Sequence, residues 1–227
     1  VEISRRPPKC LVYNRPMPLR PRKASHLQKR DTELSLTLST RPTIVDRFVP
    51  KSLAADVALI AGGAALTAAA AQVQIPMVPV PITGQTFTVL LVGAALGLNR
   101  AALSMVLYVI LGVAGLPVFT GAKAFVAGGP TMGYLAGFIA AAALVGYLAQ
   151  REWDHKWFGV VASFVAGNLV IYAFGLTWLS VFLGTVGAAN DLTATLNAGM
   201  IPFLIGDAIK IALAAVVLPL AWKIVKR

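Results

Sequence analysis

The hydrophobic residues of this chain fall into six long blocks, separated by short breaks that are polar or rich in proline and glycine. About 20 consecutive apolar residues in a helix span the hydrocarbon core of a bilayer, and fewer suffice when the helix is short or broken. By that measure the pattern predicts an all-α, polytopic membrane protein with six transmembrane helices. The predicted spans cover residues 53–74, 84–98, 101–116, 131–149, 158–183 and 199–222.

The beginning of the chain lacks this pattern. Residues 1–50 are rich in Pro, Ser, Thr and Arg, and they contain none of the apolar stretch that is typical of a secretory signal peptide. We therefore expect a disordered, basic N-terminal arm over 1–50, followed by a six-helix transmembrane substrate-binding domain over 51–227. The Arg-rich, acid-poor start of the arm also resembles an organellar transit peptide, so its role stays open.

Composition supports a membrane protein, and charge predicts its orientation. Hydrophobic residues make up 57% of the chain, charged residues only 13%, and the mean hydropathy is +0.75, whereas soluble domains carry about 25% charged residues. Short cytoplasmic loops collect Lys and Arg, and an N-terminus inside the cell leaves only Lys123 outside. Both termini are therefore predicted to be cytoplasmic. The basic residues then placed inside are Arg47, Lys51, Arg100, Arg151, Lys156, Lys223, Lys226 and Arg227.

Several kinds of chemistry are not expected from this composition. Cys10 is the single cysteine, and His26 and His155 are the two histidines, so neither an intrachain disulfide nor a metal site built from Cys and His is predicted. The net charge of +11 comes mostly from residues 1–51, which hold 12 of the 20 Lys and Arg residues and 4 of the 9 Asp and Glu residues. We expect membrane lipid to surround the apolar part of the chain, and we expect no nucleic acid as a partner.

The last predicted span, MIPFLIGDAIKIALAAVVLPLAW, carries two charged residues, Asp207 and Lys210. Their spacing of three places them on one side of a helix. One hypothesis is structural, an ion pair that neutralises itself and holds neighbouring helices together. The other is functional, because ionisable residues inside a membrane are costly and commonly face a ligand or a water-filled cavity. Lys210 would then offer positive charge to a solute, and Asp207 would accept hydrogen bonds from it. The two hypotheses are compatible.

The stretch VPVPITGQTF, residues 78–87, follows the first predicted span and is rich in proline. Proline removes backbone donors and forces an extended path, and irregular backbone at membrane depth is tolerated only when it is buried or faces a cavity. This stretch is therefore predicted to act as a lid, with Thr83 and Gln85 able to bind a ligand. Alternatively, Thr83 caps the next helix and Gln85 lies in its first turn.

Further polar residues accompany the fourth and fifth predicted spans. Thr131 and Tyr134 stand near the start of the fourth span, after a Gly/Pro-rich loop, and are predicted to point into a cavity. Alternatively, Thr131 is satisfied by the preceding turn. Asn168 and Tyr172 lie one turn apart on the fifth span, and an Asn is more favourable against other helices than against lipid. All four are predicted to line the ligand site.

The first predicted span repeats small residues four positions apart, at Ala61, Ala65 and Ala69. Such a face lets another helix approach closely. We predict a partner-docking surface here, although alanine-rich spans also arise from composition alone.

With these features in order, the chain resembles the BioY family, the biotin-specific S-components of energy-coupling-factor transporters. The resemblance covers about 53–222 and includes one departure, Met132, where the family usually has glycine. It is carried by five motifs in the family's order: VPVPITGQTF, LGVAGLPVF, GGPTMGYLAGF, the pattern GN-xxx-Y-xx-G-xx-WL from Gly167 to Leu179, and PFLIGDAIK.

The resemblance implies a protein of the plasma membrane that binds biotin from outside. It also implies association with a transmembrane coupling subunit and two ATP-binding-cassette ATPases. Biotin is then the transported ligand, and no cofactor is expected. Asp207 and Lys210 correspond to the family's Asp-xx-Lys pair at the biotin site, and the Ala61, Ala65 and Ala69 face corresponds to the surface that docks the coupling subunit.

Other functions are less favoured by the sequence. An S-component for another small vitamin and a stand-alone biotin facilitator remain alternatives. An intramembrane enzyme that uses Asp207 and Lys210 as acid and base lacks a second catalytic carboxylate or a nucleophile–base set in the spans. The sequence contains no G-x-x-x-x-G-K-[ST], so ATP hydrolysis is expected in the partners.

Overall fold

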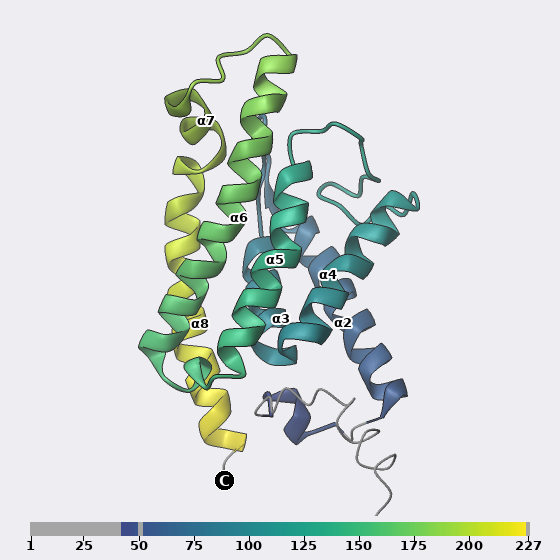
Figure 1. The fold of residues 1–227 in the computed structure, drawn as a ribbon, viewed down its shortest axis with the longest axis vertical. Helices are drawn as coiled ribbons and strands as arrows, with labels where there is room; N and C mark the ends of the chain where they lie inside the picture. Colours follow the sequence, from purple (N-terminus) through teal and green to yellow (C-terminus); the bar gives the residue numbers. More distant parts are fainter. Residues whose placement is uncertain (1–41, 50–51, 226–227) are drawn as a thin grey trace, which may run out of the picture. The chain divides into compact units, whose positions relative to one another are not determined.

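The computed structural model describes residues 42–49 and 52–225, which form a helical bundle with one short β-hairpin (Figure 1). Four stretches are long and apolar enough to cross a membrane: Leu53–Gln72, Met132–Ala149, Trp157–Thr185 and Leu192–Ile224. The chain is therefore a multi-pass membrane protein. In chain order the elements are the 3₁₀ helix η1 (Val45–Arg47), α2 (Leu53–Gln72), β1 (Gln74–Ile75), β2 (Ile82–Thr83), α3 (Gln85–Leu96), α4 (Leu98–Val113), α5 (Met132–Ala149), η2 (Trp153–His155), α6 (Trp157–Thr185), α7 (Leu192–Gly199), η3 (Ile201–Phe203) and α8 (Leu204–Val225).

Each of the six predicted spans coincides with a helix, in the order α2, α3, α4, α5, α6 and α8. However, α3 and α4 have 12 and 16 residues, fewer than the about 20 that a simple span needs. The six-span count therefore stays a prediction. In Figure 1, α2 begins and α8 ends at the same end of the bundle. Which side of the membrane this end faces also stays a prediction.

Residues 42–49 were assigned to the arm, but the structure packs them against the bundle. Thr43 is buried, and both its backbone N–H and its hydroxyl donate to Asp46 Oδ2 at 2.9 Å. Arg100, in the first turn of α4, donates to Asp46 Oδ1 at 2.6 Å and lies 2.7 Å from Asp56 of α2. The compact body thus begins earlier than residue 51. The predicted disorder of the arm concerns residues 1–41, which lie outside the described residues.

This contact also changes the chemistry of Asp46. Burial by itself would raise the pKa of its carboxyl group, but hydrogen bonds from Arg100 and Thr43 favour the charged form more strongly. The net effect is a pKa below the usual value of 3.8. Asp46 is therefore a charged anchor between the preceding segment and α4.

The break between α3 and α4 lies at Gly97, not at Asn99–Arg100 as predicted. Gly97 has a φ of +79°, which a residue with a side chain rarely adopts. A Cβ at Gly97 would also meet Gln150 Nε2 and Thr43 Cγ2 at 2.7 and 2.9 Å. The backbone of Gly97 passes so close to Gly146 of α5 that a Cβ on Gly146 would lie 2.5 Å from it. The chain turns where glycine permits the turn, and the following Asn and Arg already belong to α4.

The region from 184 to 203 also differs from the prediction. It was expected to be a loop followed by a helix starting at about Gly199, but it contains α7 and η3, and α8 begins only at Leu204. The Asp191 side chain caps α7 by accepting from the Ala194 N–H at 3.4 Å. Pro202 stands in the first positions of η3, where its missing N–H costs little.

The 74–83 segment, expected to be irregular, is a β-hairpin. Gln74 pairs with Thr83 and Ile75 with Ile82 in an antiparallel register, and the prolines lie in the connection. The pairing satisfies backbone groups on both sides of the proline-rich connection.

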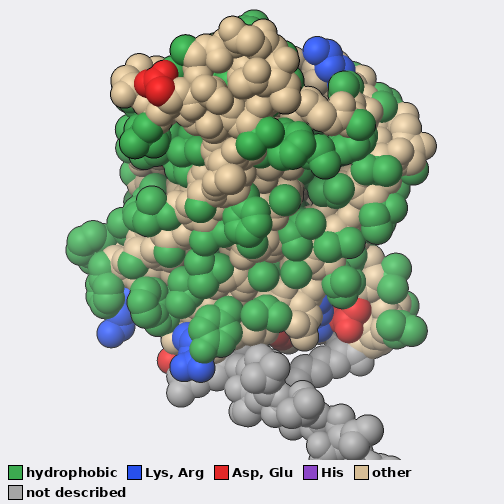
Figure 2. All heavy atoms as spheres, turned by 45° about the horizontal axis from the view of Figure 1, so that its top comes forward, with side chains coloured by type: hydrophobic (Ala, Val, Ile, Leu, Met, Phe, Trp, Pro, Cys, Tyr) green, Lys and Arg blue, Asp and Glu red, His purple; other side chains and the backbone are tan. Residues whose placement is uncertain are grey.

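Glycines let α5 and α6 approach closely, in agreement with small-residue packing in membranes. A Cβ on Gly133 would meet the Phe174 carbonyl and the Trp178 side chain, and one on Gly137 would meet the Ile171 backbone at 3.0 Å. Hydrophobic side chains cover the middle of the face shown in Figure 2, while the charged side chains on that face gather at its two ends. This distribution is typical of a protein embedded in lipid.

Candidate functional site

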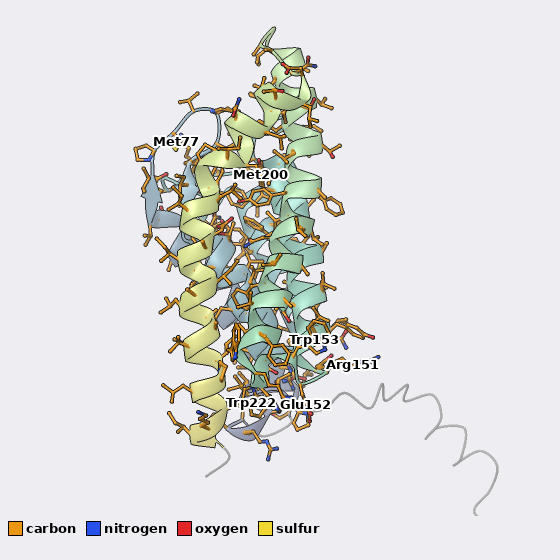
Figure 3. All side chains as sticks on the ribbon, turned by 90° about the vertical axis from the view of Figure 1, so that its left-hand side faces the viewer. Met77, Arg151, Glu152, Trp153, Met200 and Trp222 are labelled. Carbon is orange, nitrogen blue, oxygen red and sulfur yellow. The ribbon has the colours of Figure 1, made fainter. Side chains whose placement is uncertain are left out.

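A cavity of about 680 Å³ opens at the end of the bundle that holds the hairpin. Figure 3 shows Met77, one of its lining residues, at the opposite end from Arg151 and Trp222. Its walls come from the hairpin, the loop between α4 and α5, and the helices α3, α5, α6 and α8. They are largely apolar, with Met77, Val78, Val80, Phe119, Phe125, Val126, Leu135, Phe138, Ile171 and Phe203 among the lining residues.

Asp207 and Lys210 meet at one wall of this cavity. Asp207 is only 5% exposed, its Oδ2 accepts a hydrogen bond from the Tyr172 hydroxyl, and its Oδ1 lies 3.3 Å from Lys210 Nζ. Tyr172 and Lys210 both line the cavity, whereas Asp207 stands directly behind them. The geometry of Asp207 and Lys210 agrees with both the structural and the functional hypothesis, because the two residues form an ion pair and this pair also adjoins a cavity.

The late start of α8 places Asp207 in the first turn of the helix. The first N–H groups of a helix lack intrahelical acceptors, and the helix dipole favours a negative charge there. The carboxylate is thus stabilised by Tyr172, Lys210 and the helix start together. Asp207 therefore lies closer to the start of its helix than the predicted span 199–222 implied.

Lys210 connects α8 to the end of the hairpin and to the start of α3. Its Nζ donates to the Thr83 carbonyl at 3.0 Å and to Thr86 Oγ1 at 2.8 Å, in addition to Asp207. An ammonium group has three donors, and here each has an acceptor. A ligand that takes a hydrogen bond from Lys210 must therefore replace a contact to α3, to the hairpin or to Asp207.

Gln85 is the centre of a second polar network. It is 6% exposed and lines the cavity. Its Nε2 donates to the Tyr108 hydroxyl at 2.5 Å, and its Oε1 accepts from Thr83 Oγ1 at 3.1 Å and from Thr120 Oγ1 at 3.2 Å. The Tyr108 hydroxyl in turn donates to the Val118 carbonyl at 3.2 Å. Gln85 thus holds the hairpin, α4 and the 114–131 loop together at the cavity.

The capping alternative for Thr83 is wrong in its position, because Gly84 is the N-cap of α3, but Gln85 does lie in the first turn as that alternative predicted. Thr83 Oγ1 accepts from the Gln85 N–H at 3.4 Å while it donates to the Gln85 side chain. Tyr108 and Thr120 were not predicted from the sequence. A signal was available for Tyr108, because Ser104 and Tyr108 are polar residues four positions apart in an apolar run and therefore share one face of α4. Thr120 lies in a loop, where no periodic pattern marks it.

The remaining predicted site residues differ in their placement. Thr131 lines the cavity at the N-terminal end of α5. Tyr134 also lines it, but its hydroxyl donates to the Gly199 carbonyl at 2.8 Å and so holds α5 against the end of α7. Asn168 is buried on α6, one turn from Tyr172, and is not among the residues that line this cavity. The structure therefore brings Thr83, Gln85, Thr131, Tyr134, Tyr172 and Lys210 to one cavity and leaves Asn168 apart from it.

The predicted docking face lies outside the cavity. Ala61, Ala65 and Ala69 are all exposed on α2, while Gly63, Ala64 and Thr67 face the bundle. Exposed Gly62 adds to the small-residue face, since nothing lies within 4 Å of a Cβ placed on it. A helix can approach this surface closely.

Comparisons with known proteins show the family of the chain. The model of the BioY family matches residues 39–227. The chain belongs to the BioY family. A biotin transporter BioY of Thermotoga maritima is 39% identical over 155 residues, covering 67% of this chain and 87% of that protein. A probable biotin transporter BioY of Pyrococcus horikoshii is 35% identical over 180 residues, covering 72% and 94%.

A solved structure gives the same family assignment at the level of the fold. The crystal structure of the S-component for biotin from an ECF-type ABC transporter matches with a TM-score of 0.63 and 25% identity, covering 74% of this chain and 90% of that one. The family predicted from the five sequence motifs is thus confirmed. The family match begins at residue 39, so it includes the segment 42–49 that packs against α4.

Proposed function

We propose that this chain binds biotin in the 680 Å³ cavity and mediates biotin uptake as the S-component of an energy-coupling-factor transporter. The observation that carries the proposal is the ion pair between buried Asp207 and half-buried Lys210 at a largely apolar cavity, in a chain whose relatives are named biotin transporters. Small-molecule sites are commonly about 300–1,000 Å³, largely apolar, with a few placed polar groups. Biotin, with a bicycle that contains a polar ureido group, an apolar aliphatic chain and a carboxylate, fits such a site.

The proposed roles follow from donor and acceptor chemistry. Asp207 accepts hydrogen bonds from ligand N–H groups, and Lys210 donates to a ligand carbonyl or carboxylate oxygen. Tyr172 holds the Asp207 carboxylate in place. The apolar walls, including Phe125, Phe138 and Ile171, contact the rings and chain of the ligand. Thr83, Gln85 and Thr131 are further contacts in this proposal.

We further propose six spans, with both termini in the cytoplasm and the cavity open to the outside of the plasma membrane. Arg151 lies at the end opposite to Met77 of the cavity, and Arg100 contacts η1 just before α2. Lysine and arginine are retained on the cytoplasmic side. Lys123, at the cavity, is the basic residue that this orientation leaves outside.

The partners in this proposal are a transmembrane coupling subunit, which docks on the Ala61, Ala65 and Ala69 face, and ABC-type ATPases that supply the energy. The exposure of these three alanines on α2 supports a close helix–helix contact at this face.

Equilibrium binding of radiolabelled biotin to the purified chain in detergent tests the proposal. We expect saturable binding that unlabelled biotin displaces and other vitamins do not. Displacement by another vitamin at lower concentration would indicate a different S-component specificity. Binding that is absent under conditions where the chain stays monodisperse would contradict the proposal.

Uptake by cells separates transport from binding. We expect uptake with the coupling modules, and the Ala65→Trp variant should bind biotin normally yet fail to support uptake, because the indole blocks the close approach of a partner helix. Full uptake by the variant would refute the docking face. Uptake in cells without the modules would instead favour a stand-alone facilitator.

A further inference from the structure

A second hollow lies between the start of α6 and the last turns of α8, a groove of about 600 Å³. It belongs to the end of the bundle where Figure 3 shows Arg151, Trp153 and Trp222, opposite to Met77 of the biotin cavity. Lys156, just before α6, and Lys223, on α8, both line it, and none of its lining residues is acidic. The groove is therefore a positively charged recess between two membrane helices.

The wall that α8 contributes is apolar and contains Pro219. Proline has no N–H, so the carbonyl of Ala215, four residues earlier, loses its helical donor. Ala215 and Pro219 both line the groove. A carbonyl freed at membrane depth is stabilised by any donor that reaches it. The wall thus offers an apolar surface for an acyl chain, and one backbone acceptor for a hydroxyl or ammonium group.

The side of the groove that comes from α6 carries exposed aromatic rings. Trp157 is 66% exposed and Phe158 56% exposed, and Lys156 Nζ lies 5.7 Å from the centre of the Phe158 ring. Tryptophan next to lysine is typical of the level of lipid headgroups. The groove therefore stands where phosphate groups and acyl chains of the bilayer meet.

A buried contact holds the two helices around this groove. Asp154, 3% exposed, accepts from Trp222 Nε1 at 2.5 Å. The His155 ring lies 4.1 Å from the Trp222 ring. These contacts join η2, immediately before α6, to the last turns of α8. Asp154 is not among the residues that line the groove, whereas Lys156 and Lys223 are.

We propose that this groove binds an anionic phospholipid of the surrounding bilayer, with Lys156 and Lys223 on its phosphate and an acyl chain along the Ala215–Leu220 wall. Basic pockets between transmembrane helices bind anionic headgroups in this way. Two cations without an acidic neighbour in the lining complement a phosphate diester, and the apolar wall complements the attached chain. The site is separate from the biotin cavity, since the two share no lining residue.

Tryptophan quenching by brominated lipids tests the site, because Trp157 lines the groove. The purified chain in mixed micelles is titrated with phosphatidylglycerol or phosphatidylcholine that carries brominated acyl chains. We expect tighter binding of phosphatidylglycerol, by at least about fivefold for the contribution of one lysine. The Trp157→Phe variant should lose this anion-dependent part of the quenching.

The double variant Lys156→Gln/Lys223→Gln should lose the preference for phosphatidylglycerol while biotin binding stays normal. The matched control Arg47→Gln/Arg151→Gln removes two charges near the same end but outside the groove, and it should keep the preference. A second variant, Val216→Phe, fills the groove without changing its charge or adding a tryptophan, and it should also lose the preference. Equal quenching by both lipids in the wild type, or equal losses in the groove variant and the control, would overturn the proposal.

Discussion

Two buried aspartates, Asp207 and Asp154, stand near opposite ends of α8 and have similar surroundings at first sight. Asp207 is 5% exposed and Asp154 3% exposed, and each accepts a hydrogen bond from an aromatic side chain of a neighbouring element, Tyr172 or Trp222. They differ in what lies beside them. Asp207 adjoins Lys210 and the 680 Å³ cavity, whereas Asp154 fastens η2 to the last turns of α8.

The comparison teaches that a buried carboxylate does not mark a ligand site by itself. A carboxylate that only joins two elements is satisfied by fixed protein donors. Asp207 becomes a candidate ligand contact because its partners, Tyr172 and Lys210, form the wall of a cavity. The same residue type thus contributes to packing at one end and, in our proposal, to binding at the other.

The largest effect is expected from Asp207→Asn. This change removes the charge that holds Lys210 and alters the acceptors offered to the ligand, and hydrogen bonds to charged groups contribute about 1.5–3 kcal/mol. We expect biotin affinity to fall by about 10–100-fold in equilibrium binding. The matched control is Asp154→Asn, an equally buried carboxylate far from the cavity, which should leave the affinity unchanged. Equal losses of biotin affinity in both variants would mean that the burial of the carboxylate, and not its position at the cavity, causes the loss.

The next effect concerns stability at the opposite end. Trp222→Phe removes the N–H that donates to Asp154 Oδ2, and a buried acceptor that loses its donor costs about 1–3 kcal/mol. We expect a lower midpoint of thermal unfolding in detergent and unchanged biotin affinity. A stability equal to that of the wild type would contradict the structural role of this contact, and weaker biotin binding would show that the two ends are coupled.

A smaller effect is expected from Tyr172→Phe. The ring stays in place, but the hydroxyl that donates to Asp207 is lost. A single hydrogen bond commonly contributes about 0.5–1.5 kcal/mol, so biotin affinity should fall by about 2–12-fold, less than in Asp207→Asn. The matched control is Tyr147→Phe, which does not line the cavity and whose hydroxyl accepts from Arg151 Nη2 at 2.6 Å, and it should leave the affinity unchanged. A Tyr172→Phe affinity within error of the wild type would remove Tyr172 from the proposed site.

The two ends of α8 also show which buried residues can be predicted from the sequence. Asp207 and Lys210 could be singled out because charge inside an apolar run is costly wherever it occurs. Asp154 could not be recognised as buried, since it stands in the polar stretch QREWDHKW between two apolar segments. Helix positions followed from block length, but the turn at Gly97 depends on the close approach of α5, which no local pattern records.

Contacts between distant segments were the least predictable part of the candidate site. Lys210 donates to Thr83 and Thr86, more than 120 residues earlier in the chain, and the Gln85 network includes Thr120 from a loop. Periodicity identifies which residues share a face of one helix, and it contains no information about which loop covers that face. Asn168 shows the opposite error. Its polarity suggested that it belongs to the ligand site, but the fold places it away from the cavity lining.

The smallest change in stability is expected at a third aspartate, Asp46, which is partly exposed and pairs with Arg100. Its pKa is lowered in the folded chain because hydrogen bonds from Arg100 and Thr43 outweigh the effect of burial. Its charged form therefore stabilises the fold above the usual pKa of 3.8, and this contribution is lost as the pH falls through the lowered folded value. We expect Asp46→Asn to cost about 1 kcal/mol at neutral pH.

The pH dependence distinguishes this charge effect from a simple loss of packing. The difference in unfolding midpoint between wild type and Asp46→Asn should be constant from neutral pH down to about 5 and should shrink below it, as the wild-type carboxyl takes up its proton. Unfolding in a detergent that tolerates acid, followed at several pH values, measures the difference. A gap that persists unchanged under acid would show that the shape of the Asp46 side chain, and not its charge, holds residues 42–49 to α4.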